Sequence, residues 1–256
     1  MNSTNIEIKK AVKAGNSSSV ILPRAWLHKE VRIELLERTP ESVLLDVLNI
    51  IKNKIPLIDI IGIYLVGSYA RGEETEDSDI DILVVTKHIN EPEIKEGIYS
   101  ITIASKKIIE KKLETNLFPI GQMLKEAKPL LNSDYLSSIN IQVTKNNINW
   151  YLKTTKEKLE LIKASLQKIK KIDPRIIYTL ILRIKTLYII EKLISNKNYS
   201  GKEFRDLIDK IAGKNAYASY LSVKNNSEEK SLCLKEEAEK LASYLEMQLR
   251  EVWERV

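Results

Sequence analysis

Two acidic residues one position apart, Asp79 and Asp81, could together bind a metal ion. They flank Ile80 in the segment VGSYARGEETEDSDIDILVV, which covers residues 66–85. Because side chains alternate along a strand, both carboxylates should project from one face and Ile80 from the other. Oxygen ligands on one face suit Mg²⁺, which proteins usually hold through one or two carboxylates and the phosphates of a substrate. The spacing therefore predicts a magnesium site at Asp79 and Asp81.

A Gly-Ser pair, Gly67 and Ser68, ends the apolar run before these acids, and ten residues separate Ser68 from Asp79. Gly67 would let the backbone approach a ligand closely, while N–H groups at the start of the next helix and the Ser68 hydroxyl could hold triphosphate oxygens. Arg71 and Ser78 complete the candidate nucleotide-binding residues. A metal here would neutralise the leaving pyrophosphate and orient the α-phosphate for in-line attack, so no protein nucleophile would be needed.

The same stretch resembles the nucleotidyltransferase signature of the polymerase-beta superfamily, and within it the minimal nucleotidyltransferases of prokaryotes, with Arg71 and Gly72 also matching. The resemblance implies transfer of a nucleoside monophosphate from a nucleoside triphosphate to a hydroxyl on a protein, an RNA or a small molecule, with Mg²⁺ as cofactor. It makes Asp79 and Asp81 the catalytic residues as well as the metal ligands. The alternative is a surface acidic loop that binds no ligand, and a solvated loop is the usual setting for an acidic run such as Glu73, Glu74, Glu76 and Asp77.

One part of the family pattern is missing. The family usually has a third carboxylate on a neighbouring strand, where it completes the second metal site and can assist deprotonation of the attacking hydroxyl. The matching strand reads YSITI at residues 99–103, and its inward polar positions would be Ser100 and Thr102, neither of them acidic. Glu96 lies just before that strand and could reach inward. Losing a metal ligand weakens positioning and activation, so a nucleotide-binding domain with impaired catalysis stays open as an alternative.

The sequence pattern around these residues predicts a small α/β domain over residues 39–145, whose helices and strands would position them. Thr39 can cap a helix that has Pro40 at its first position. An almost continuous apolar run at residues 57–66 predicts a central strand that is buried on both faces. The pattern then continues with a short helix, a strand at 80–85, a loop, a strand at 99–104 and a helix that begins near Ser105.

Residues 1–38 predict a small β-rich element. Apolar and polar residues alternate at 6–12, 20–22 and 31–35, and Gly15 marks a turn between the first two strands. The stretch KKAVKAGNSSSVILPRAWLHKEVRIELL resembles an AbrB-type swapped-hairpin element. The resemblance implies a homodimer that can bind DNA, with phosphate contacts from Lys9, Lys10, Lys13 and Arg24. The alternative is a dimerisation module that touches no DNA.

Residues 146–256 are predicted to be wholly helical, with apolar stripes at helical spacing. Asp173 and Pro174 mark one helix start, and the apolar stretch 176–194 belongs in the centre of a bundle. Further residues expected to cap helices are Ser200 with Glu203, Gly213 and Ser227. The segment resembles the HEPN-like helical domains that often accompany these transferases. Because it contains no histidine, the RNA cleavage carried out by some of those domains is not expected.

The composition sets broader bounds. The chain has 256 residues, with 41 Lys and Arg against 35 Asp and Glu, and its formal charge of +6 fits either polyanionic partners or a lysine-rich solvated surface. A single cysteine excludes an internal disulfide, and two isolated histidines give no zinc site. No secretory signal or membrane-spanning run is visible, so we expect a cytoplasmic protein without membrane contact.

Functions of different classes follow from these observations. The first is a nucleotidyltransferase with an α/β (α+β) domain, a β-rich N-terminal element and an all-α C-terminal bundle. The alternative is a DNA-binding regulator or antitoxin-like protein whose transferase domain only senses nucleotide. A purely structural protein that holds an acidic protein or RNA through its helical bundle is a third possibility, which no specific residue favours.

Overall fold

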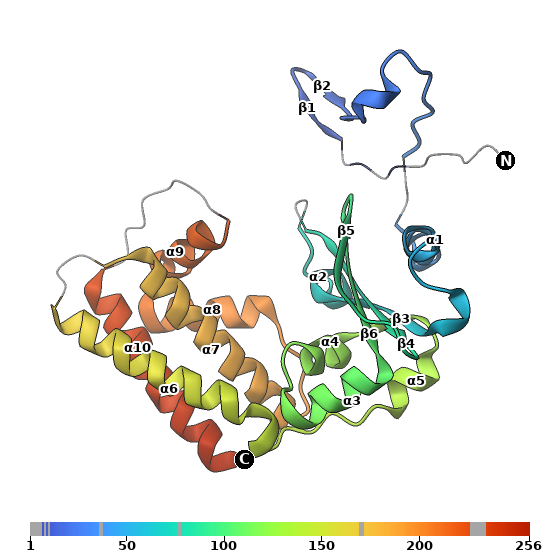
Figure 1. Cartoon of the computed structure of the whole chain (residues 1–256). Coiled ribbons are helices and arrows are strands. Elements are labelled where there is room, and N and C mark those ends of the chain that lie inside the picture. The colour runs from blue at the N-terminus through green and yellow to red at the C-terminus, as the bar shows by residue number, and fades with distance from the viewer. Residues whose placement is uncertain are drawn as a thin grey trace. The chain divides into compact units, whose positions relative to one another are not determined.

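The computed structural model describes residues 7, 9, 11–35, 38–75, 78–168, 172–225 and 234–256. Figure 1 follows the chain from an N-terminal hairpin through a five-stranded sheet to a set of long helices. By its internal contacts the chain forms two compact units, Met1–Ile109 with Glu126–Ile139 and Glu110–Lys125 with Asn140–Val256. The chain therefore leaves the first unit after Ile109, returns to it at Glu126 and leaves it again after Ile139.

A mixed sheet forms the centre of the first unit. Its strand order is β5-β6-β4-β3-β7, in which β4 and β6 run parallel and the other neighbours run antiparallel. The strands are β3 (Ile60–Val66), β4 (Ile80–Thr86), β5 (Glu91–Glu96), β6 (Tyr99–Ser105) and β7 (Lys128–Leu131). The central strand β4 is held firmly, because Ile80, Ile82 and Val84 on one of its faces are fully buried. The expected α/β character of this part of the chain is confirmed.

The sheet differs from the sequence prediction at three places, one of which is the strand β7, which was not predicted. The strand expected from residue 57 begins at Ile60, because Leu57–Asp59 form a 3-10 turn after Pro56 and Leu57 and Ile58 are exposed there. The loop expected between β4 and β6 contains β5, whose sequence is EPEIKE. Four of its residues are charged and Ile94 is its buried apolar residue, so the segment lacks the alternating apolar pattern that predicts a strand.

The helix α1 (Pro40–Ile51) is capped by Thr39, as the sequence predicts. Thr39 Oγ1 accepts a hydrogen bond from the Ser42 N–H at 3.2 Å, and Ser42 Oγ accepts one from the Thr39 N–H at 3.0 Å. The buried face of α1, with Val47 and Ile51, packs into the same core as the strands. Shorter helices between and after the strands are α2 (Gly67–Arg71), α3 (Lys106–Thr115), α4 (Ile120–Glu126) and α5 (Ser133–Ser138).

The N-terminal element is a short hairpin with a turn of helix. It consists of β1 (Val12–Ala14), β2 (Ser17–Ser19) and the 3-10 turn η1 (Arg24–Trp26). The strands pair antiparallel across the expected turn at Gly15, whose φ is 62°. The strands predicted at 20–22 and 31–35 are not formed, because within the described part of the chain no strand pairs with them. Of the strand predicted at 6–12, residues 6, 8 and 10 lie outside the described residues, and residue 12 begins β1.

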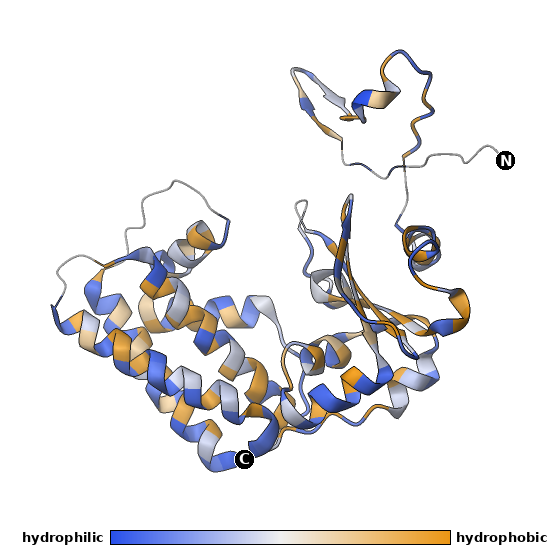
Figure 2. Cartoon of the chain, viewed as in Figure 1, coloured by the Kyte–Doolittle hydropathy of each residue, from blue (hydrophilic) through white to orange (hydrophobic). Residues whose placement is uncertain are grey.

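The second unit is helical, as predicted for the C-terminal part. Its long helices are α6 (Lys145–Lys168), α7 (Pro174–Ile194), α8 (Gly201–Ala212), α9 (Lys214–Lys224) and α10 (Lys235–Arg255). The helix α7 contacts α6, α8, α9 and α10, and its residues Ile177, Leu180 and Ile184 are fully buried, which confirms the central place expected for this stretch. Figure 2 shows hydrophobic and hydrophilic residues alternating along α6, α7 and α10, as in helices with one face in a core.

The expected capping residues lie at both ends of α8. Ser200 Oγ accepts a hydrogen bond from the Glu203 N–H at 3.3 Å at the start of α8, and Gly213, with φ 86°, ends it. The last helix differs from the prediction: Ser227 lies outside the described residues, and α10 begins at Lys235. Leu234 precedes the helix and is 63% exposed. None of the helices in the described residues is both long and apolar enough to cross a membrane.

Candidate functional site

The sheet places Asp81 at the junction of three strands. Asp81 is the second residue of β4, and it pairs with Val66 at the end of β3 on one side and with Ser100 of β6 on the other. Asp79 comes just before β4, where its side chain is exposed, whereas Asp81 is partly buried. Burial is the main cause that raises the pKa of Asp81, and the negative charge of Asp79 adds to it, so the two predicted acids interact electrostatically at the start of β4.

Gly67 lies directly against the Asp81 carboxylate. Its φ is 70°, a conformation that other residues rarely adopt, and a Cβ atom added there would fall 2.2 Å from Asp81 Oδ2. The turn from β3 into α2 can therefore approach this carboxylate only because residue 67 has no side chain. The structure thus places the predicted phosphate-binding turn beside one of the predicted metal ligands.

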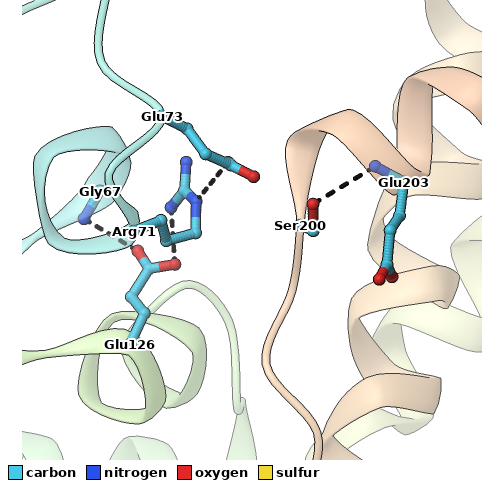
Figure 3. A network of polar contacts seen from close by, with 6 residues as sticks. All are labelled: Gly67, Arg71, Glu73, Glu126, Ser200 and Glu203. Atoms are coloured by element: carbon cyan, nitrogen blue, oxygen red, sulfur yellow. Dashed lines mark hydrogen bonds and ion pairs between the residues drawn. The ribbon is translucent and has the colours of Figure 1, made fainter.

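A third acidic residue, Glu126, holds this turn from the other side (Figure 3). Its Oε1 accepts a hydrogen bond from the Gly67 N–H at 2.9 Å, and its Oε2 accepts one from Arg71 Nη1 at 2.6 Å. The Glu126 side chain is only 7% exposed. Sequence reasoning missed Glu126, because the residue lies far along the chain at the end of α4 and no local pattern marks it.

Arg71 donates hydrogen bonds to two carboxylates. Besides Glu126, it contacts Glu73, whose Oε2 accepts a hydrogen bond from Arg71 Nε at 2.9 Å. Burial opposes the charge of the guanidinium, but the hydrogen bonds and charges of Glu73 and Glu126 outweigh it and raise the pKa of Arg71. Arg71 therefore has two carboxylate partners in this structure, and its contact with a phosphate stays a prediction.

The electrostatic environment of Asp81 is strongly acidic. Burial raises the pKa of this carboxyl above its ordinary value, and the charges of Asp79, Glu126 and Glu93 raise it further, while Arg71 lowers it. Burial and nearby negative charge both make a carboxylate more costly to ionise. A cation bound beside Asp81 would lower that cost.

Oxygen donors dominate this region, which fits a hard cation such as Mg²⁺. Asp79 and Asp81 supply carboxylate oxygens, and Mg²⁺ commonly completes its shell with water and substrate phosphates. Within the described ranges, no group of three or more His, Cys, Asp or Glu side chains is placed so that it could hold a metal ion.

The acidic residue nearest to the predicted inward position on β6 is Glu93. Ser100, which pairs with Asp81, donates a hydrogen bond from Oγ to Glu93 Oε1 at 3.1 Å. Glu96, the acid that the sequence suggested, is the last residue of β5 and pairs with Tyr99. Glu93 could not be found from the sequence, because β5 itself has no recognisable strand pattern.

The two predicted serines have different settings. Ser68 lies in α2, partly buried, and its backbone carbonyl accepts a hydrogen bond from the Glu73 N–H at 3.0 Å. Ser78 closes a turn before β4, since its Oγ accepts a hydrogen bond from the Thr75 N–H at 2.9 Å and contacts Thr75 Oγ1 at 3.1 Å. The Ser78 hydroxyl is therefore engaged in shaping the loop that leads to Asp79.

The residues proposed to contact DNA lie in the N-terminal element. Lys13 of β1 and Arg24 of η1 are exposed. Lys9 forms an ion pair with Glu7 at 3.1 Å. Lys10 lies outside the described residues. The exposed pair provides positive charge at the surface of this element without defining a partner.

The chain matches one family of known proteins and is similar to solved structures. A family model described as "Nucleotidyltransferase domain" matches residues 44–200. A nucleotidyltransferase-like protein from Exiguobacterium sibiricum 255-15 is 14% identical, with 82% of this chain and 74% of that chain covered and a TM-score of 0.35. A spectinomycin adenyltransferase from Enterococcus faecialis, solved with ATP and spectinomycin, is 13% identical, with 82% and 98% covered and a TM-score of 0.43. No curated protein matches significantly.

The family match spans more than half of the chain and includes the segment from Gly67 to Asp81. The fold agrees with it, since in the mixed sheet β3 leads into the glycine turn and its neighbour β4 contains Asp81, with Asp79 just before it. The chain belongs to the nucleotidyltransferase domain family.

Proposed function

We propose that the chain transfers a nucleoside monophosphate from a nucleoside triphosphate to a hydroxyl group, with Mg²⁺ held by Asp79 and Asp81. The observation that carries this proposal is the close approach of Gly67 to the Asp81 carboxylate. The backbone turn expected to hold the triphosphate lies beside an acid expected to hold the metal. Transfer requires the cation to contact phosphate oxygens and protein carboxylates at once, and this arrangement meets that need.

Each residue of the site has its own task in this proposal. Asp79 and Asp81 hold the cation, which when bound would neutralise charge on the phosphates and the leaving pyrophosphate. Gly67 lets the backbone approach the phosphates, and Ser68 offers its hydroxyl to them. Arg71 has a different task from the one that the sequence suggested, because Glu73 and Glu126 occupy its guanidinium. Its role is to shape the turn.

We assign the position of the missing third carboxylate to Glu93. The Ser100 hydroxyl donates a hydrogen bond to Glu93 and stands in register with Asp81, so the edge strand β5 presents an acid where β6 has none. The charge of Glu93 also acts on Asp81. A carboxylate in this place could accept the proton of the attacking hydroxyl or add an oxygen ligand to the cation.

The test is a transfer assay with a matched acidic control. Purified protein is incubated with Mg²⁺ and each α-labelled ribonucleoside triphosphate, and pyrophosphate release is followed together with label on protein or RNA. We expect the double variant Asp79→Asn, Asp81→Asn to lose activity. A control with two exposed acids of α6 changed, Glu157→Gln and Glu160→Gln, alters the charge equally and should stay active. Equal rates for the Asp variant and the wild type would reject the proposal.

A second candidate function rests on the N-terminal element. It is a DNA-binding regulator or antitoxin-like dimer in which the transferase domain senses nucleotide. Apolar side chains of this element are unusually exposed in the single chain, with Ile21 at 72%, Ile33 at 70% and Leu35 at 99%. Such side chains are normally covered, and a second copy of the hairpin would cover them as in the AbrB-type element that the sequence resembles.

DNA binding is tested separately from dimerisation. Retention on duplex DNA should weaken steeply as salt concentration rises, because phosphate contacts release counterions. The triple variant Lys9→Ala, Lys10→Ala, Lys13→Ala should lose this retention. If the wild type does not bind duplex DNA even at low salt, the DNA-binding hypothesis fails.

A further inference from the structure

Glu126 accepts hydrogen bonds from two donors that could otherwise bind a phosphate. The Gly67 N–H and the Arg71 guanidinium both point at its carboxylate, one on each oxygen. Figure 3 shows Glu126 reaching from α4 to the turn, with Arg71 between it and Glu73. The carboxylate is buried, so its charge is balanced within the protein and not by water. Removing it would leave both donors without this acceptor.

Two roles are consistent with such a contact, and the structure favours one. Glu126 could be a competitor that the triphosphate displaces, or a permanent support that fixes the turn. A displaced Glu126 would have to leave two charge-assisted hydrogen bonds and stay, negatively charged and buried, close to an incoming triphosphate. A Glu126 that stays in place leaves the Ser68 hydroxyl and the rest of the turn to face the nucleotide.

We propose that Glu126 is a positioning residue for nucleotidyl transfer, which fixes the Gly67 turn against Asp81 by joining the Gly67 N–H to Arg71. The inference rests on the proposed function and adds to it the reason why Arg71 is not a phosphate ligand. Through Arg71 the support extends to Glu73, at the end of the short segment that leaves α2. Glu126 thereby ties the end of α4 to the segment that precedes Asp79.

The contact geometry says what each substitution should remove. In Glu126→Gln the side-chain oxygen can still accept the Gly67 N–H, but the amide NH₂ then faces the Arg71 guanidinium, which is also a donor. In Glu126→Asp the charge is kept and the side chain is one methylene shorter, so one of the two contacts can be kept. The two variants therefore separate the link to Arg71 from the presence of a negative charge.

The experiment measures pyrophosphate release with Mg²⁺ and the best ribonucleoside triphosphate, together with binding of a methylanthraniloyl-labelled ATP. For Glu126→Gln we expect kcat to fall on the order of tenfold to a hundredfold, with KM changing much less, since a displaced turn spoils transition-state geometry more than ground-state binding. Glu126→Asp should recover part of kcat. The exposed Glu157→Gln of α6 is the control for charge.

A double-mutant cycle with Arg71→Gln shows whether Glu126 acts through Arg71. If it does, the double variant should lose little more activity than the worse single variant. Thermal unfolding of every variant separates misfolding from mispositioning, and Glu126→Asp serves if Glu126→Gln does not fold.

The outcomes are distinct. An active wild type with Glu126→Gln equal to Glu157→Gln overturns this inference and leaves the proposed function standing. A lower KM in Glu126→Gln also overturns it, and identifies the carboxylate as a competitor of the phosphates. A wild type that neither binds labelled ATP nor releases pyrophosphate removes the proposed function and this inference together.

Discussion

Any side chain at position 67 would collide with Asp81, because its Cβ would lie 2.2 Å from the Asp81 Oδ2 atom. This relationship couples the turn after β3 to the acid at the start of β4. It explains why a glycine follows the last residue of β3, Val66.

Gly67→Ala should therefore remove activity as well as stability. The positive φ and the collision should cost roughly 1–3 kcal/mol of the free energy of unfolding. Displacement of the turn should lower pyrophosphate release by about a hundredfold. Gly72→Ala is the matched control, since Gly72 also has a positive φ of 69° but nothing lies within 4 Å of its added Cβ. Equal losses of activity in both variants would show that the contact with Asp81 has no special role.

Asp81→Asn should abolish transfer while making the metal-free protein slightly more stable. The pKa of Asp81 is raised by burial and by the neighbouring carboxylates, so the folded state holds this proton more tightly than the unfolded state. Between the unfolded pKa of Asp81 and its higher folded pKa, the carboxyl ionises more readily in the unfolded state. The free energy of unfolding therefore falls as pH rises through this range.

Denaturant titrations without Mg²⁺ check this sign. Near neutral pH, Asp81→Asn should have a higher free energy of unfolding than the wild type, and the difference should shrink at low pH where wild-type Asp81 is protonated. Added Mg²⁺ should stabilise the wild type and not the variant, by mass action on the folded state. A variant that is less stable than the wild type at neutral pH would contradict the repulsion inferred here.

Glu93→Gln should reduce kcat more than Glu96→Gln, although both residues belong to β5. Glu93 accepts the Ser100 hydroxyl beside Asp81, whereas Glu96 pairs with Tyr99 at the end of the strand. Loss of a general base or an outer metal ligand commonly costs about 10²-fold. Initial rates over a range of Mg²⁺ concentrations would measure it. If Glu96→Gln has the larger effect, the carboxylate suggested by the sequence is the functional one.

Ile33→Glu should convert a dimer to a monomer without loss of transfer. Ile33 is 70% exposed in the single chain, and a charge there would oppose burial against a second copy. Ile58, which is 82% exposed in the 3-10 turn before β3, provides the control Ile58→Glu, expected to leave the mass unchanged. Light scattering after gel filtration gives the mass of each. A wild type that is monomeric at micromolar concentration would contradict the predicted dimer.

The sequence was informative wherever a local pattern has a single physical meaning. The Thr39 cap, the strand from Ile80, the central stretch of α7 and the Ser200 cap were all predictable, because each depends on neighbours within a few residues. The closeness of Gly67 to Asp81 follows from two adjacent strands and could also be predicted.

The rest of the site depends on contacts between distant segments. Glu126 reaches Arg71 across 55 positions of sequence, and no periodicity can announce such a pair. Glu93 was hidden because an edge strand of charged residues has no apolar alternation to reveal it. The two carboxylate partners of Arg71 likewise could not be assigned without the fold.

The interrupted path of the chain through the first unit has a practical consequence for fragments. A piece ending at Ile109 would contain the glycine turn and both aspartates, yet it would lack β7 and Glu126, which the chain supplies only on its return. Such a piece would expose an edge of β3 and leave Arg71 short of its most buried partner. Isolating the transferase fold from its helical companion therefore calls for splicing two separate stretches, and a single cut cannot achieve it.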